Sequence, residues 1–376
     1  MERGMSNRII AYDSARTVAV IGMIFINTIK ILDIRHFESS WADRMVNLVT
    51  GRAAVIFVML AGAGMILSYD RTSIRDKTAF RQRMLMRAAL LGSIGGLFMM
   101  VWNADILHYY AGYILLGVIL LDTSTSILIN ILKKMVLISL PICMVVAYEV
   151  EGGQIYETLF MACTPSLIAD YFFLSNYYPV FPWFCFFLMG MLLGHLERSP
   201  NKRIFKQIFT VSSILFLGIE VFSSSLNTDA VAGRWVDLDN PLWRSIILSE
   251  AFPVTPLFLF SAGALGLALI SLLRLLEERP KRARSLISWV ALGRMSLSVY
   301  IFHILICNTY NQWIVHQQGN ASGHQAITFA IGFIMIGIVL ASVWSYCFGR
   351  GPLEFGINKL TKFLSKPVIQ SWQTKI

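Results

Sequence analysis

The sequence predicts an all-α membrane protein, a bundle of about ten transmembrane helices, and three observations predict this class. Of the 376 residues, 56% are hydrophobic and only 14% are charged. The mean hydropathy is +0.62. Apolar runs of about twenty residues, the length of a helix that crosses a bilayer, recur along the whole chain. This pattern excludes the soluble classes of protein.

The first element is an apolar run at 9–32. It contains Asp13 and Arg16 and shows no small-residue cleavage site, so we expect a membrane helix and not a cleaved signal peptide. The complete set of predicted spans is 9–32, 53–69, 84–101, 106–122, 127–148, 178–196, 204–222, 254–275, 286–306 and 326–349.

Two later elements need comment. The short turn Trp102-Asn103-Ala104-Asp105 predicts a tight antiparallel pair of helices around it. Lys133 and Lys134 interrupt the start of the fifth span, which we expect to begin after them. Because no internal repeat or low-complexity linker is evident, we expect residues 1–376 to form one domain.

Lysine and arginine set the predicted orientation. Most of the 32 fall on one side of the predicted spans, and those on the other side are Lys30, Arg35, Arg44, Arg52, Arg234 and Arg244. The positive-inside rule then puts both termini in the cytoplasm and the loop after the first span outside, in a multi-pass protein of the plasma or inner membrane. This rule and contact with anionic membrane lipid account for the net charge of +10, so no nucleic-acid partner is expected. The five cysteines lack C-x-x-C spacing, which indicates neither a disulfide framework nor a metal site.

Polar residues inside or beside the spans are candidates for a catalytic site, because burial in a membrane is costly. On the outer side we expect Asn27, Asp105, His108 and His303 at a depth that the His36 loop reaches. Each has a plain alternative: Asn27 as a bond between helices, Asp105 as a helix cap, and the two intramembrane histidines as interface residues bonded to backbone carbonyls. We rank His36 first as general base, since histidine titrates near neutrality, with Asn27 as hydrogen-bond donor to an oxyanion.

A second polar set lies on the inner side. Asp13 and Arg16 are three residues apart on one helical face and are expected to pair with each other or with Arg294. One interpretation is a structural ion pair. The other is a basic mouth for an anionic, phosphate-bearing ligand, built from Arg16, Arg83, Arg87, Arg282, Arg284 and Arg294.

Seven stretches stand out in this order: Ala11-Tyr12-Asp13-Ser14-Ala15-Arg16, Ile26-Asn27, His36 with Ser40-Trp41-Ala42-Asp43, Phe57-Val58-Met59-Leu60-Ala61-Gly62, Trp102 through Ala111, Phe181-Pro182-Trp183-Phe184 with Leu188-Met189-Gly190-Met191, and Gly293 through His303. In type and order they resemble the heparan-alpha-glucosaminide N-acetyltransferase family and its bacterial relatives, from roughly Arg8 to Ile306. Thr17 stands where the family usually has glycine, and the loop from Asn27 to His36 is shorter than in the animal enzymes.

The resemblance implies an enzyme that takes acetyl-CoA from the cytoplasm and transfers the acetyl group to an amino sugar or other saccharide at the far face of the membrane. The family's asparagine and loop histidine correspond to Asn27 and His36, acting through an acetyl-histidine intermediate or by direct transfer. His108 and His303 stay open as alternative bases, and both N- and O-acetylation and a homodimer stay open as well. No metal is implied.

The rival hypothesis is a transporter or carrier of a sugar or lipid-linked saccharide, with Asp13, Asn27 and His303 along its route. The chain shows no inverted repeat and no matching pair of Gly/Pro-broken spans, the usual indications of alternating access. The acetyltransferase is therefore the favoured prediction.

Overall fold

The computed structural model describes residues 9–34, 40–150, 177–199, 203–226, 241–278, 289–318 and 321–365. The described part is helical, and its one extended pairing is an isolated bridge between Ala251 and Val254. Its elements are α1 (Ile10–Ile31), α2 (Ser40–Val49), α3 (Arg52–Asp70), η2 (Ile74–Asp76), α4 (Lys77–Phe98), α5 (Leu107–Ile119), α6 (Thr125–Val150), α9 (Val180–Leu196), α10 (Arg203–Leu226), α12 (Pro241–Ile247), α13 (Pro256–Glu277), α15 (Val290–Arg294), α16 (Ser296–Gln318), α17 (Gly323–Phe348) and α18 (Pro352–Leu364).

Six helical segments of the described chain are long and apolar enough to cross a bilayer: α1, the segment Ala42–Asp70, which covers most of α2 and all of α3, the Thr125–Met144 part of α6, α10, α13 and α17. The helices α5 and α9 are apolar but shorter. Nine of the ten predicted spans each coincide with one helix, and the remaining one, 286–306, overlaps α15 and the first half of α16, so the prediction of an all-α membrane protein is confirmed. The number of ten crossings and the location of the termini stay predictions.

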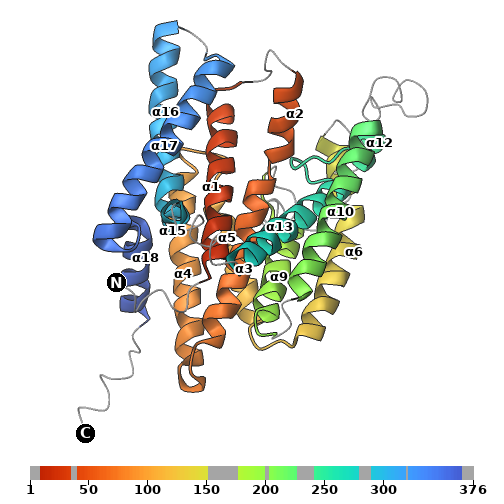
Figure 1. Ribbon diagram of the computed structural model, residues 1–376, viewed down its shortest axis with the longest axis vertical. Helices are drawn as coiled ribbons and strands as arrows, with labels where there is room; N and C mark the ends of the chain where they lie inside the picture. The colour runs from red at the N-terminus through yellow and green to blue at the C-terminus, as the bar shows by residue number, and fades with distance from the viewer. Residues whose placement is uncertain are drawn as a thin grey trace, which may run out of the picture.

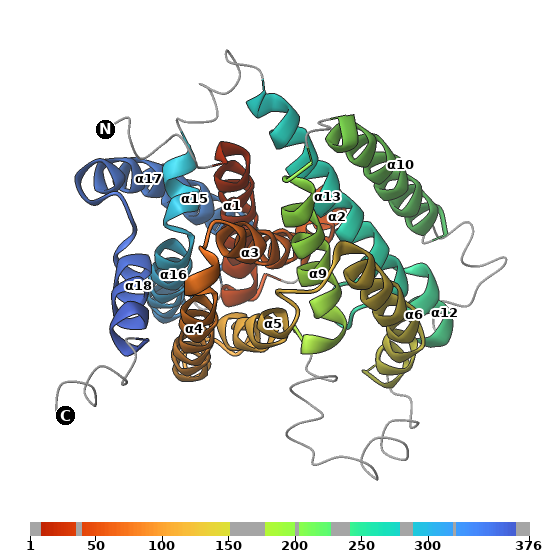
Figure 2. The same ribbon diagram turned by 90° about the horizontal axis from the view of Figure 1, so that it is seen from below.

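The helix α1 lies in the interior of the bundle, in contact with α3, α13, α15, α16 and α17 (Figures 1 and 2). Opposite edges of the bundle are formed by α10 and α18 (Figure 2). The tightest approach joins α3 to α9, where a Cβ on Gly190 would lie 1.9 Å from the carbonyl oxygen of Met59. Small residues allow two helix backbones to meet in this way, so α9 is fixed against the centre of the bundle.

Local sequence explains several helix ends. Thr255 caps α13 by accepting a hydrogen bond from the Phe258 N–H, and Pro256 follows at the first helical position. At the start of α17, Ser322 and Gln325 form a capping box. This helix ends at Gly349, whose φ of +73° is a left-handed conformation that glycine adopts without strain.

We define the basic end of the bundle as the end that carries the turn at 71–76 and the segment 197–199, and the loop end as the opposite one. Ion pairs join the helices at the basic end, including Arg198 with Asp70 and Arg274 with Glu197. The Tyr69 hydroxyl there donates a hydrogen bond to Asp122, in the turn between α5 and α6, which holds the pKa of Asp122 below its ordinary value.

The fifth predicted span begins earlier than expected. The helix α6 starts at Thr125, before Lys133 and Lys134, and both lysines are exposed. A lysine near the end of a membrane helix extends its charged group toward the interface while its methylene chain covers apolar surface. Two lysines within the first turns therefore do not prevent the helix from starting before them.

The ninth predicted span, 286–306, ends too early. A break at Met295 separates α15 from α16, and α16 continues to Gln318. Its polar residues are accommodated by hydrogen bonds: Asn308 and Thr309 donate to carbonyls four residues earlier, and Asn311 donates to the Ile31 carbonyl at 2.9 Å. The sequence had suggested a position near the outer end of the helix for His303. The residue lies instead in the first half of α16.

Candidate active site

The centre of the candidate site is Asp105, a fully buried carboxylate at the end of the turn between α4 and α5. Its Oδ2 accepts hydrogen bonds from the backbone N–H of Leu107 (2.9 Å) and of His108 (3.2 Å), so the expected helix cap is present. The same oxygen lies 3.1 Å from His108 Nδ1, and Oδ1 accepts from the Tyr300 hydroxyl at 3.1 Å. Two backbone N–H groups and the Tyr300 hydroxyl thus donate to a carboxylate that is shielded from solvent.

The contact between His108 Nδ1 and Asp105 Oδ2 fits a tautomer in which Nδ1 carries the proton and Nε2 is the basic nitrogen. A histidine oriented by a carboxylate is a recurrent form of the general base in acyl transfer. The sequence proposed Asp105 and His108 as members of one site, and the structure brings them into contact.

A glycine sets this geometry. A Cβ on Gly95 in α4 would lie 2.3 Å from the backbone nitrogen of His108 and 2.8 Å from Asp105 Oδ2. Only a residue without a side chain allows α4 to approach the start of α5 so closely.

His303 and Asn27 lie on α16 and α1, which run side by side in the same direction. The Gly293 N–H, just before α16, bonds to the Thr17 hydroxyl at 3.1 Å, and Asn311 reaches Ile31 at the far end of α1. Both predicted residues are buried, and His303 Nε2 and Asn27 Nδ2 have no hydrogen-bond partner among the described residues. His303 Nδ1 lies 3.3 Å from the Tyr300 carbonyl oxygen, which fits the backbone-bonded alternative for this histidine.

A cavity of about 170 Å³ connects this network to two arginines. Arg16 and Arg87 line it together with Tyr110, and Ile106, Leu107 and Tyr300 line it beside Asp105. Met23 also lines it, and Asn27 lies one helical turn beyond Met23 on the same face of α1. His303 lies three residues after Tyr300 on α16. Of the predicted residues, Arg16 and Arg87 line this cavity, and Asp105, Asn27 and His303 lie within one helical turn of residues that line it.

The arginines predicted to form a basic mouth divide into groups. Asp13 lies between two of them: its Oδ1 is 2.7 Å from Arg16 Nη1 and its Oδ2 is 3.4 Å from Arg294 Nε, so both expected pairings are present at once. The Nε–H of Arg83 donates to the Ala79 carbonyl of its own helix, and Arg83 does not line the cavity. Arg282, Arg284 and the predicted base His36 lie outside the described residues.

Sequence reasoning missed two tyrosines and a glutamate. Tyr300 bonds to Asp105, and Tyr110 lines the cavity. The spacing of Tyr300 and His303, three residues apart on one helix, was an available signal. Glu354 of α18 accepts hydrogen bonds from the N–H groups of Leu297 (2.8 Å) and Ser298 (3.2 Å) and so caps the start of α16. Because this contact is long-range, no local sequence pattern predicts it.

Comparison with known families identifies the chain. Residues 8–220, more than half of the chain, match the model of the heparan-alpha-glucosaminide N-acetyltransferase catalytic family. The chain belongs to this family. The match contains Asn27, His36 and the Asp105–His108 pair, so the chain is a membrane protein of an acyltransferase family and carries the catalytic region.

The rest of this acetyltransferase-family chain matches a second model. Residues 197–363 match DUF418, a family of proteins of unknown function, and this part contains Arg294, Tyr300 and His303. The two matches meet at the candidate site, because Tyr300 of the second bonds to Asp105 of the first. No curated protein and no solved structure matches the chain.

Proposed function

We propose that this chain is an inner-membrane acetyltransferase that takes acetyl-CoA from the cytoplasm and transfers its acetyl group to an amino sugar or other saccharide at the opposite face. The observation that carries the proposal is the cavity with Arg16 and Arg87 on its wall and the Asp105–His108–Tyr300 network at its boundary. It joins groups suited to phosphates and groups suited to proton transfer within one family of acyltransferases.

In direct transfer, the acceptor amine or hydroxyl attacks the thioester carbonyl carbon while a histidine takes its proton. The carbonyl π electrons move onto oxygen, and the Asn27 amide donates a hydrogen bond to this oxyanion. The carbonyl then re-forms, the carbon–sulfur bond breaks, and the histidinium protonates the leaving thiolate to give CoA. In the alternative route the histidine nitrogen attacks the thioester carbonyl carbon, the carbon–sulfur bond breaks and CoA leaves. The acceptor then attacks the acetyl-histidine carbonyl carbon, the carbon–nitrogen bond to the imidazole breaks, and the released imidazole takes the acceptor's proton.

Three histidines compete for the role of base. The family resemblance favours His36, and the contact with Asp105 favours His108. His303 is the third candidate, because its Nε2 is buried beside the same network without a partner among the described residues.

The phosphates of acetyl-CoA carry several negative charges, and guanidinium groups bind phosphate through paired N–H donors. Arg16 and Arg87 would bind these phosphates in the cavity that they line. Arg294 lies close to Arg16, because both arginines pair with Asp13. On this proposal the basic end faces the cytoplasm, where acetyl-CoA is made available, and the acceptor enters from the loop end.

The carrier hypothesis is the weaker alternative. Membership of an acyltransferase family favours chemistry over transport, and a carrier does not require a histidine held by a buried carboxylate.

Purified protein with each of His36→Ala, His108→Ala and His303→Ala separates these possibilities. The variant that lacks the base should lose acetyl transfer by about 10²–10⁴-fold while it still binds acetyl-CoA and keeps its melting temperature. Asn27→Ala should lose less, because an oxyanion donor stabilises charge without moving the proton.

The panel also has a decisive negative result. If all three histidine variants transfer acetyl groups at the wild-type rate, or if the wild-type protein neither binds nor consumes acetyl-CoA, the proposed function is wrong.

A further inference from the structure

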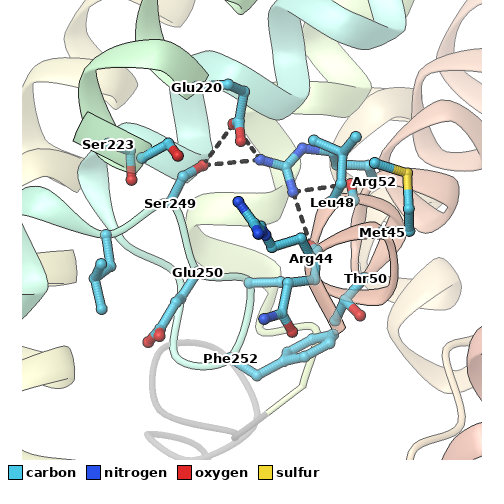
Figure 3. Close-up of a pocket in the computed structure, with 14 residues that line it drawn as sticks. Arg44, Met45, Leu48, Thr50, Arg52, Glu220, Ser223, Ser249, Glu250 and Phe252 are labelled. Atoms are coloured by element: carbon cyan, nitrogen blue, oxygen red, sulfur yellow. Dashed lines mark hydrogen bonds and ion pairs between the residues drawn. The ribbon is translucent and has the colours of Figure 1, made fainter. Parts of the chain in front are cut away.

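A second, larger cavity opens at the loop end, away from the candidate active site. It has a volume of about 560 Å³ and lies between α2, the end of α10 and the segment 248–252 (Figure 3). Its wall carries the hydroxyls of Thr50, Ser223 and Ser249, the charged groups of Arg44 and Glu250, and the ring of Phe252. We call it the polar pocket.

A buried ion pair builds one wall of the polar pocket. Arg52, only 2% exposed, pairs with Glu220 and donates to the Ser249 hydroxyl at 2.9 Å (Figure 3). It also donates to the backbone carbonyls of Asn47 (3.2 Å) and Leu48 (3.0 Å), which ties α2 to α10 and to the segment before α13. The pair cancels its own charge, so the wall presents hydroxyl and carbonyl oxygens in a fixed arrangement and no strong net charge.

An apolar groove of about 620 Å³ continues from the polar pocket. Its wall includes Ile21 and Phe25 of α1, Phe216 of α10, Leu265 of α13 and Ile331 of α17. The two cavities share Met45, Leu48 and Arg52, so they meet at the junction of α2 and α3. Since the groove lies along helices of membrane-spanning length, its natural occupant is a hydrocarbon chain.

Aromatic rings connect the polar pocket to the candidate active site. The Phe252 ring lies 5.4 Å from Tyr178, Tyr178 lies 6.3 Å from Tyr109, and Tyr109 lies 3.9 Å from the His108 ring, measured between centroids. Lys30, in the last turn of α1, lies 4.2 Å from the centroid of Phe252. One contiguous aromatic cluster therefore joins the wall of the polar pocket to the His108 ring.

We propose that the acetyl acceptor is a lipid-linked saccharide, with its sugar in the polar pocket and its hydrocarbon chain in the apolar groove. This rests on the proposed function and names its substrate class. The polar pocket offers neutral hydroxyls, one cation, one carboxylate and an aromatic ring. These groups suit a sugar, whose ring presents hydroxyls at its edge and C–H groups on its face. Each volume lies in the range of roughly 300–1,000 Å³ typical of small-molecule sites, and their junction accommodates one amphiphile.

The test uses full-length protein in phosphatidylcholine nanodiscs and two acceptors, glucosamine and dodecyl β-D-glucosaminide. With acetyl-CoA in excess, the KM for the alkyl acceptor should be lower by at least about tenfold, because burial of several methylene groups adds to binding. Ile331→Trp, which fills the groove, should abolish this advantage, measured as the ratio of the two KM values within the same variant. Ile336→Trp on the same helix replaces an exposed isoleucine outside the groove and should keep the advantage.

A second measurement locates the chain directly. Dodecyl β-D-glucosaminide with a diazirine in its alkyl chain should label groove residues on illumination, and an excess of the unlabelled compound, but not of dodecanol, should prevent labelling.

The outcomes separate the two proposals. Acetyl transfer with equal KM values for both acceptors, an undiminished advantage in Ile331→Trp, or labelling outside the groove overturns the lipid-linked acceptor and leaves the acetyltransferase intact. Groove labelling without consumption of acetyl-CoA overturns the acetyltransferase, and with it the acceptor role.

Discussion

At the scale of single residues, burial and hydrogen bonding distinguish the predicted groups. Asp105 accepts hydrogen bonds from three donors and contacts His108, whereas Arg83 bonds to its own helix. Arg16 and Arg87 share a cavity although their helices are far apart in sequence. The residue types were visible in the sequence; which of them act together depends on contacts between helices.

Arg16 and Arg87, which line the cavity, should contribute more to acetyl-CoA binding than Arg83, which does not line it. Arg16→Ala and Arg87→Ala should each weaken acetyl-CoA binding by about 1.5–3 kcal/mol, the range for hydrogen bonds to charged groups. Arg83→Ala, one turn earlier on α4 and outside the cavity, is the matched control and should change affinity little. Isothermal titration of purified protein measures this, and the wild-type affinity should fall as salt rises. Equal effects at Arg83 and Arg87 would contradict the cavity as the phosphate site.

The Arg52–Glu220 pair should be a strong determinant of stability. Glu220→Met leaves the buried Arg52 charge without its partner and should destabilise the protein by roughly 3–5 kcal/mol, whereas Arg52→Met leaves a carboxylate that is 24% exposed and should cost less. The double variant Arg52→Met/Glu220→Met should recover part of this loss, since it leaves no uncompensated charge. Melting temperatures in detergent provide the comparison. A double variant that loses the sum of both single losses would exclude this coupling.

At the scale of elements, two helices receive their N-terminal caps from distant helices. The carboxylate of Glu277 in α13 accepts from the N–H groups of Ile10 (2.8 Å) and Ala11 (3.3 Å), where α1 has no side-chain cap of its own. Glu354 does the same for α16. A carboxylate at a helix N-terminus satisfies free N–H groups and interacts favourably with the helix dipole. The helix α18, which no predicted span covered, thus fixes a helix that lines the cavity.

Loss of this cap should loosen the start of α16. Glu354→Ala should cost about 1 kcal/mol of stability, the usual cost of a lost cap. Glu354→Gln should cost less, because the amide oxygen still accepts a hydrogen bond. Hydrogen exchange should show faster exchange at Leu297 and Ser298, with the far end of α16 unchanged. Uniform acceleration along α16 would indicate global unfolding and not a local cap.

At the scale of the whole molecule, the two ends of the bundle differ in chemistry. Ion pairs and the turn at 71–76 lie at the basic end, and the polar pocket lies at the loop end. The cavity at Arg16 and Arg87 lies between these ends, beside the buried network. A reaction that takes one substrate from each side of a membrane requires two ends with different chemistry.

Cysteine labelling tests the orientation in intact cells. In a background without the five native cysteines, one of which, Cys347, is exposed, Ser39→Cys should react with an impermeant thiol reagent and Ser73→Cys should not. Ser73 lies in the turn at the basic end, before η2. Both should react after permeabilisation, which controls for accessibility. Labelling of Ser73→Cys alone in intact cells would reverse the orientation.

The sequence by itself determined the class of protein, the place of each main helix and the family. Apolar runs of membrane length and the order of short motifs are local properties, so they can be recognised without knowledge of packing. Errors occurred where polar residues were read as helix boundaries, at Lys133 and after Ile306, because a membrane helix accommodates such residues by extending them to the interface or by bonding them to backbone carbonyls.

Only the tertiary structure decided which side chains meet. The contact of Tyr300 with Asp105, the shared cavity of Arg16 and Arg87, and the union of the polar pocket with the apolar groove each join helices that are distant in sequence. Helical periodicity fixes the face on which a residue lies but not the neighbour that this face contacts. That neighbour is set by close packing at small residues such as Gly95 and Gly190, where two backbones approach until no side chain fits between them.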